Sequence, residues 1–343
     1  MKNVTMVVAF VHCLCACADT ACIGAYVIDA VTQEPIPNIK VSASFSNDNG
    51  WKAWTESAPI YHDTQETDVN GFCALKGKTN IGRAGCGVDK QGEKYYGAGG
   101  RGFHFTRKNF FGVWQPDNLV ATIRLQRVEH PIPLCVKSVE LTMRPEQETK
   151  DEGANAVLQY DLVAGDWLPP VGHGKIADLT MKTHSNFVEH VKGGVVDFDC
   201  YERSLSVVFP GNGNGIAPIV AKPTDGIKVR QVPSSGYVPA VMKRFGRKKS
   251  IRGVVISPKF YSDEDPNRCY VFRIRSQYDE KGNLVEAYYG KIYGDFNFSK
   301  VWYYGERQFF LYYLNPKSLD RNLEWDMKNN LCPNSGSLGQ LQP

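Results

Sequence analysis

The stretch from Ala25 to Phe72 limits the possible fold of this chain more than any other part. Residues 25–29 and 39–45 are rich in apolar and β-branched side chains, and Pro35 lies between them, where it excludes a helix. From Ile39 to Phe45 apolar residues alternate with polar ones, which is the period of a strand with one buried face. Asn70-Gly71 then supplies the positive φ of a tight turn before another strand. The stretch therefore predicts a β-domain.

The same stretch resembles the carboxypeptidase regulatory-like family, a small transthyretin-like β-sandwich. The resemblance lies in two motifs, whose matching residues are Val27, Asp29, Thr32, Pro35, Ile36 and Val41, and then Thr67, Asp68, Asn70 and Gly71. Ala25 stands where the family usually has Gly, and Cys73 directly follows Phe72, so the apolar positions of that strand are shifted by one. The resemblance covers the N-terminal third of the chain. It implies a scaffold, linker or interaction module and no catalytic residues.

A length of 343 residues predicts two domains, each large enough for a core. Residues 129–133 read E-H-P-I-P, which is typical of a short, stiff linker. Short β-like segments resume from Leu134, and the turn residues 279–283 lie between two of them, as in a hairpin. The expected fold is thus all-β, with a transthyretin-like sandwich at 22–128 and a larger antiparallel sandwich, or jelly roll, at 134–332. A helix is expected over 318–330, and a disordered tail over 333–343.

The N-terminus has the pattern of an export signal. Lys2 precedes an apolar run from Val4 to Leu14, and small residues follow it up to Ala18. Residues 1–18 therefore predict a signal peptide, too short to span a bilayer, and no other stretch is long enough to be a transmembrane helix. An overlapping interpretation is a bacterial lipobox, in which Cys17 carries a lipid anchor. Either alternative places the protein in the periplasm, on the cell surface or outside the cell.

Ten cysteines are present, and three of them lie in the export segment. The other seven are an odd number, so at least one stays unpaired in an oxidising compartment. Cys73 and Cys86 flank a Gly-rich turn, and we expect them to form a disulfide across a hairpin. The alternative is that both are buried free thiols, which behave as small apolar residues.

Signatures of catalysis and metal binding are missing. The chain contains no G-x-S-x-G, no H-E-x-x-H and no C-x-x-C, so no cofactor is expected and a non-enzymatic role is favoured. Asp263 and Asp265 lie in an acidic segment that could hold calcium, although a solvated acidic turn is the favoured explanation. His184 and His190 would share one face of a strand, but about 20 Å apart, too far to hold one metal ion.

One segment concentrates positive charge, with six cations among residues 243–252. An acidic glycan, lipopolysaccharide or an anionic membrane would suit this segment, and the alternative is a solvated loop. Its candidate binding residues are Lys243, Arg244, Arg247, Lys248 and Lys249. The net charge of only +4 does not favour a nucleic-acid partner.

A second segment, residues 288–313, concentrates aromatic side chains. A sandwich core accounts for most of them, but Trp302 and Tyr303 fall in a turn where they are candidates to contact a sugar or peptide. Trp51 and Trp54 lie in an insertion within the first domain and are candidates for the same reason.

These features favour an exported bacterial envelope protein without enzymatic activity, which serves as a scaffold or binds a glycan or an envelope protein. One alternative is a hydrolase of polysaccharides that uses acids of the second domain, such as Asp161 and Glu324. Another is a purely structural envelope component.

Overall fold

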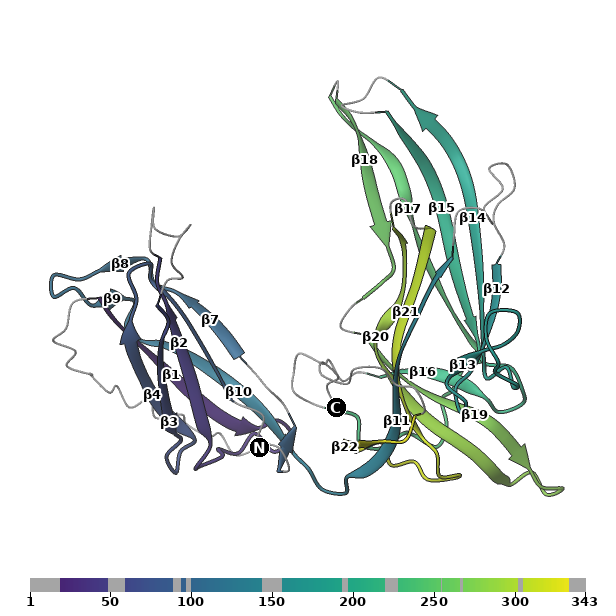
Figure 1. Ribbon diagram of the computed structural model, residues 1–343, viewed down its shortest axis with the longest axis horizontal. Helices are drawn as coiled ribbons and strands as arrows, with labels where there is room; N and C mark the ends of the chain where they lie inside the picture. Colours follow the sequence, from purple (N-terminus) through teal and green to yellow (C-terminus); the bar gives the residue numbers. More distant parts are fainter. Residues whose placement is uncertain are drawn as a thin grey trace. The chain divides into compact units, whose positions relative to one another are not determined.

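The computed structural model describes residues 19–48, 59–88, 94–96, 100–143, 156–192, 197–219, 228–253, 255–265, 268–301 and 305–332. The chain divides into two compact units, Met1–Arg127 and Val128–Pro343. Both are β-sandwiches, and the described residues contain no α-helix (Figure 1). The predicted signal peptide and tail lie outside the described residues, as do Cys17, Trp51, Trp54, Trp302 and Tyr303.

The first unit packs two four-stranded sheets, with the orders β4-β1-β10-β6 and β3-β2-β5-β7, beside a small β8–β9 hairpin. Its alternating residues fill the core as the sequence predicts: Val41, Ala43 and Phe45 are all buried. The strands are β1 (Thr20–Asp29), β2 (Lys40–Ser46), β3 (Tyr61–Glu66), β4 (Phe72–Lys78), β5 (Arg83–Val88), β6 (Tyr95–Tyr96), β7 (Gly100–His104), β8 (Arg107–Lys108), β9 (Trp114–Gln115) and β10 (Leu119–Arg127).

The polar residues of the two sequence motifs build the turns of this unit. Thr67 accepts a hydrogen bond from the Ile39 backbone N–H at 2.9 Å and donates one to the Ile36 carbonyl at 2.8 Å. The Asp68 carboxylate accepts the backbone N–H groups of Asn70 and Phe72. Gly71 has φ +71°, where an added Cβ would lie 2.5 Å from a backbone oxygen. The motifs therefore specify backbone geometry and not a chemical site.

The expected disulfide between Cys73 and Cys86 is wrong, because both remain thiols. The segment between them crosses from one sheet to the other: β4 pairs with β1, whereas β5 pairs with β2. The two residues consequently lie in one buried core and do not form a cross-strand pair of a hairpin. Burial, followed by the nearby Cys86, raises the pKa of the Cys73 thiol to about 12.

The second unit is larger and packs two six-stranded sheets, with the orders β13-β12-β14-β15-β17-β18 and β16-β19-β20-β21-β11-β22. All their pairings are antiparallel except β11 with β22. The strands are β11 (Ile132–Met143), β12 (Ala156–Asp161), β13 (Asp166–Trp167), β14 (Leu179–Val191), β15 (Phe198–Val208), β16 (Gly215–Ile219), β17 (Ala240–Arg252), β18 (Val255–Ser262), β19 (Cys269–Tyr278), β20 (Leu284–Val301), β21 (Gly305–Asn315) and β22 (Trp325–Asn330).

The aromatic segment of the sequence supplies the core between these sheets. Phe296, Phe310 and Tyr312 are buried against aliphatic residues of the facing sheet, such as Leu179 and Leu205. The Tyr160 ring meets those of Phe310 and Tyr312 edge-on, with centroids 5.8 and 6.1 Å apart. Among the residues whose side chains are described, the aromatic rings of this segment thus mainly serve packing.

The helix expected over residues 318–330 is absent. Leu319 and Met327, which suggested helical periodicity, have φ of +61° and +58°, values that no right-handed helix allows. The Asp326 carboxylate instead accepts the backbone N–H groups of Lys328 and Asn329, and β22 occupies the end of the segment. Local side-chain hydrogen bonds outcompete the helix here.

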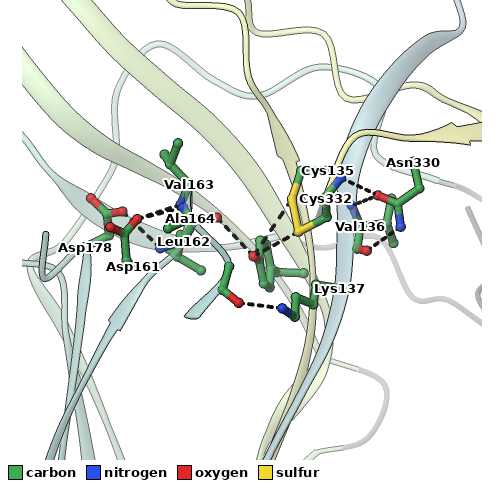
Figure 2. Close-up of a disulfide and its surroundings, with 12 residues drawn as sticks. Cys135, Val136, Lys137, Asp161, Leu162, Val163, Ala164, Asp178, Asn330 and Cys332 are labelled. Atoms are coloured by element: carbon green, nitrogen blue, oxygen red, sulfur yellow. Dashed lines mark hydrogen bonds between the residues drawn. A yellow bond between two sulfur atoms is a disulfide. The ribbon is translucent and has the colours of Figure 1, made fainter. Parts of the chain in front are cut away.

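A disulfide between Cys135 and Cys332 joins β11 to the end of β22, although 197 positions separate the two cysteines (Figure 2). The side-chain amide of Asn330 holds the two segments together next to the disulfide. Its oxygen accepts the backbone N–H groups of Val136 and Cys332, each at 2.9 Å, and its nitrogen donates to the Val136 carbonyl at 2.7 Å. The side chain therefore replaces a strand pairing and holds Cys332 beside β11.

Candidate binding groove

The distal parts of β14, β15, β17 and β18 project beyond the strands of the facing sheet (Figure 1). We call the described residues of 184–204 and 244–262 the arm. A groove of about 490 Å³ lies on the arm. Polar and charged residues of all four strands line it, among them His184, Asn186, Glu202, Arg244, Lys248 and Tyr261.

Strand register explains the shape of the groove. Asn186, Glu202, Gly246 and Tyr261 are successive cross-strand partners, so they form one row across the four strands. Gly246 leaves a gap in this row, since a Cβ there would lie 2.4 Å from the Tyr201 backbone oxygen and 2.6 Å from the Tyr261 hydroxyl oxygen. The Tyr261 side chain thus lies over Gly246 and forms a wall of the groove.

Two cations flank this gap on β17. Arg244 and Lys248 stand two residues before and after Gly246, so their side chains emerge on the same face. The Lys248 Nζ lies 5.7 Å from the centroid of the Tyr261 ring, a cation–π distance. Burial and the carboxylates of Glu202 and Asp263 raise the pKa of Tyr261, so its hydroxyl remains a hydrogen-bond donor at neutral pH.

Arg247 stabilises the arm beside the groove. Its guanidinium lies 5.3 Å from the Tyr201 ring centroid and 5.8 Å from that of Phe260, its cross-strand partners on either side. Its Nε also donates to the Asp199 carbonyl. Arg247 and the exposed Lys249 both border the groove, so four of the five predicted basic residues do so.

Lys243 is the exception, and its prediction as a surface binding residue is wrong. It is only 4% exposed, and its Nζ lies 2.7 Å from the Asp295 carboxylate inside the sandwich. The basic segment is a strand and not a loop, so successive side chains point to opposite faces. Lys243 consequently points inward where Arg244 points outward.

The acids considered for hydrolysis are occupied by structural contacts. Asp161 and Asp178 hold Arg275 at 2.6 and 2.9 Å. Burial raises the pKa of Asp161, but three backbone N–H groups and Arg275 outweigh it and leave the pKa below its usual value. Glu324 accepts the backbone N–H groups of Glu129 and His130.

The structure does not assemble the suggested metal ligands into a centre. Within the described ranges, no three His, Cys, Asp or Glu side chains are grouped as metal ligands, and this includes Asp263 and Asp265. His184 and His190 both lie on β14, but a bulge between Phe187 and Glu189 shifts the register. They face opposite sides of the arm, contrary to the shared face expected from their spacing.

Comparisons with known proteins do not assign a family. No family model matches the chain, and no curated protein matches it. Among solved structures it is similar to a streptococcal ancillary pilin, at 13% identity and a TM-score of 0.21, over 57% of this chain and 55% of that one. The major pilins SpaA and SpaD of Corynebacterium diphtheriae give 8% and 7% identity and TM-scores of 0.23 and 0.24. The match to SpaA covers 79% of this chain and 69% of SpaA, and the match to SpaD covers 78% of this chain and 92% of SpaD.

The chain thus spans about half the length of the streptococcal pilin. Among the described residues, no helix is long and apolar enough to cross a bilayer.

Sequence reasoning missed the groove residues of the other strands, namely His184, Asn186, Glu202 and Tyr261. One signal was available: Arg244, Gly246 and Lys248 alternate with Phe245 and Arg247, the period of a strand. The partners of that strand depend on register between distant segments, which a single sequence does not show.

Proposed function

We propose that this protein is an exported, non-enzymatic component of the bacterial envelope whose second unit binds an acidic glycan in the groove. The observation that carries the proposal is the pairing of Arg244 and Lys248 with the Tyr261 wall. Cationic side chains suit the carboxylate or sulfate groups of acidic sugars, and a tyrosine ring suits the apolar face of a pyranose. Neighbouring His184 and Glu202 add hydrogen-bonding groups for sugar hydroxyls.

Binding to defined polysaccharides tests this function. Titration calorimetry of the full chain with polygalacturonate should show binding that weakens as salt rises, and titration with uncharged dextran should show none. Arg244→Gln with Lys248→Gln should lower the affinity at least about tenfold, because charge-assisted hydrogen bonds are lost. Lys281→Gln is the matched control, since this lysine lies in the β19–β20 turn. Equal affinity of the double variant and the wild type would exclude the groove as the binding site.

The first unit, in this proposal, is a carboxypeptidase regulatory-like scaffold that carries no chemistry of its own. The support is the set of motif residues Asp29, Thr67, Asp68 and Gly71, which are engaged in turns. Export is proposed from the pattern of residues 1–18, with a lipid anchor on Cys17 as the alternative to release.

Cell fractionation with mass spectrometry distinguishes these fates. Cleavage after Ala18 with a soluble product supports release, whereas a diacylglycerol mass that Cys17→Ser abolishes supports the anchor. An uncleaved cytoplasmic chain would overturn export.

A further inference from the structure

A tight turn in the first unit exposes two adjacent aromatic side chains. The β8–β9 hairpin places Phe110 at 98% and Phe111 at 74% exposure, with their rings edge to face and 5.5 Å between centroids. The nearby Phe103 and Phe105 lie in the core, so apolar residues of this region can be buried. Two phenylalanines in water cost free energy, which suggests that a partner covers them.

The turn is firmly held, so the exposure is a defined feature of the fold. The Asn109 side-chain oxygen accepts the backbone N–H groups of Phe111 at 3.0 Å and Val113 at 2.9 Å. Gly112 has φ +76°, and its N–H donates to the Asn109 carbonyl at 3.0 Å. The Gly112 carbonyl in turn accepts the Asp19 backbone N–H at 3.0 Å. A preorganised turn loses little conformational entropy on binding.

Positive charge adjoins the two rings. Arg107 and Lys108 form β8, directly before the turn, and residues 100–115 contain no Asp or Glu. Arg107 is exposed, and Lys108 lies over the Trp114 ring and contacts the Asp19 carboxylate, whereas Arg101 lies farther along β7, opposite Cys86. An apolar tip next to cationic side chains is complementary to a lipid surface with anionic headgroups.

The place of the turn in the first unit agrees with this partner. β8 and β9 lie at the end of the unit away from the exit of β10 toward β11 (Figure 1). A lipid surface at this end would leave the opposite end of the unit, where β10 leads toward β11, clear.

We propose that Phe110 and Phe111 insert into an anionic lipid surface, with Arg107 and Lys108 of β8 at the headgroups. This site is separate from the groove, and it does not depend on glycan binding. Burial of the two phenylalanine rings among the lipids supplies an apolar contribution to binding. The cations add an electrostatic attraction to the anionic headgroups, which salt weakens.

Vesicle flotation tests the proposal with the full chain carrying Cys17→Ser, so that no acyl chain contributes. Vesicles of phosphatidylcholine with about 30% phosphatidylglycerol should bind the protein at least tenfold more tightly than pure phosphatidylcholine. Phe110→Ser with Phe111→Ser should lower binding at least tenfold, since two buried rings are lost. Phe187→Ser, an equally apolar change at a 60% exposed site of the second unit, should leave binding unchanged.

Three results would overturn the proposal. These are equal binding by the double serine variant and its parent, equal binding to both kinds of vesicle, and binding to protein-containing membranes but to neither pure lipid. The last would assign the turn to a protein partner. Phe110→Trp adds a direct readout, because brominated lipids should quench the new fluorescence only if the ring enters the acyl region. Unchanged thermal unfolding of each variant shows that the fold is intact.

Discussion

The Lys243 ammonium and the Asp295 carboxylate lie 2.7 Å apart and join β17 of one sheet to β20 of the other. Asp295 also accepts a hydrogen bond from the Tyr270 hydroxyl at 2.9 Å and the backbone N–H of Asp265 at 3.0 Å. The pair is buried and hydrogen-bonded on several sides, the condition under which loss of one partner is costly. It anchors the basic strand at the point where the arm leaves the sandwich.

Lys243→Ala should lower the free energy of unfolding of the second unit by about 3–5 kcal/mol, because Asp295 would be left buried without its counter-ion. Lys249→Ala, a change of the same kind at an exposed position of β17, should alter it by less than about 0.5 kcal/mol. Urea unfolding followed by circular dichroism measures both. Similar losses for the two variants would show that the pair has no special role.

Loss of the disulfide should destabilise the second unit alone. Cys135 and Cys332 close a loop of 197 positions, so the chain-entropy estimate for the cross-link is about 5 kcal/mol. Calorimetry of Cys135→Ala with Cys332→Ala should show one transition shifted to lower temperature and the transition of the first unit unchanged. Shifts in both transitions would mean that the two units unfold together.

Stability of the second unit should depend on Lys291 above neutral pH. Burial, followed by repulsion from Lys228, lowers the pKa of Lys291 to about 7. Between pH 7 and the ordinary lysine pKa, the unfolded chain binds one more proton than the folded protein does at this site. Stability from this group therefore rises with pH across that window, by up to about 1.4 kcal/mol per pH unit.

Lys291→Met removes the titration, so the advantage of the wild type over the variant should grow between pH 7.5 and 8.5. Urea unfolding at the two pH values checks this. Parallel pH profiles would show that Lys291 stays protonated, held by the Leu323 carbonyl at 2.8 Å and the Tyr293 and Tyr313 rings.

Gly71→Ala should destabilise the first unit by about 2 kcal/mol or more, because its φ of +71° is strained for alanine and its Cβ would meet the Val27 carbonyl oxygen. Gly102→Ala is the matched control, since nothing lies within 4 Å of a Cβ there. Thermal unfolding of both variants measures the difference. An equal effect would argue against the Asn70-Gly71 turn as a determinant of this fold.

Tyr261→Ala should remove a wall of the groove without a change of charge. Loss of the ring should lower the affinity for polygalacturonate about tenfold or more while the dependence on salt is retained. Calorimetric titration at two salt concentrations checks both points. Wild-type affinity in this variant would exclude Tyr261 as part of the binding surface.

The first unit was predictable because its determinants are local. The alternation from Ile39 to Phe45 and the Asn70-Gly71 turn each depend on the backbone conformation of only a few neighbouring residues. Both are found as expected. The failed helix over 318–330 has the opposite cause. Its apolar spacing is genuine, but the Asp326 carboxylate and the neighbouring strand β11 override it.

The groove was only partly predictable. Composition shows where charged residues lie in the sequence, but not to which face of the sheet their side chains point. Six cations in ten residues identified the region, but the burial of Lys243 depends on strand parity and on Asp295, which is 52 positions away. Long-range pairing also decided the cysteines. Cys73 and Cys86 looked like partners by proximity in sequence, whereas the bonded pair Cys135 and Cys332 is brought together by β22.

The position of the disulfide has a mechanical consequence. The chain enters the second unit at β11, which begins at Ile132. Cys332 is bonded to Cys135, only three residues farther along the same strand. A pull between the linker and residues beyond Cys332 would run through Cys135 and across the sulfur–sulfur bond. The closed loop between the two cysteines, which holds both sheets and the arm, would remain outside the line of tension and keep its shape under load.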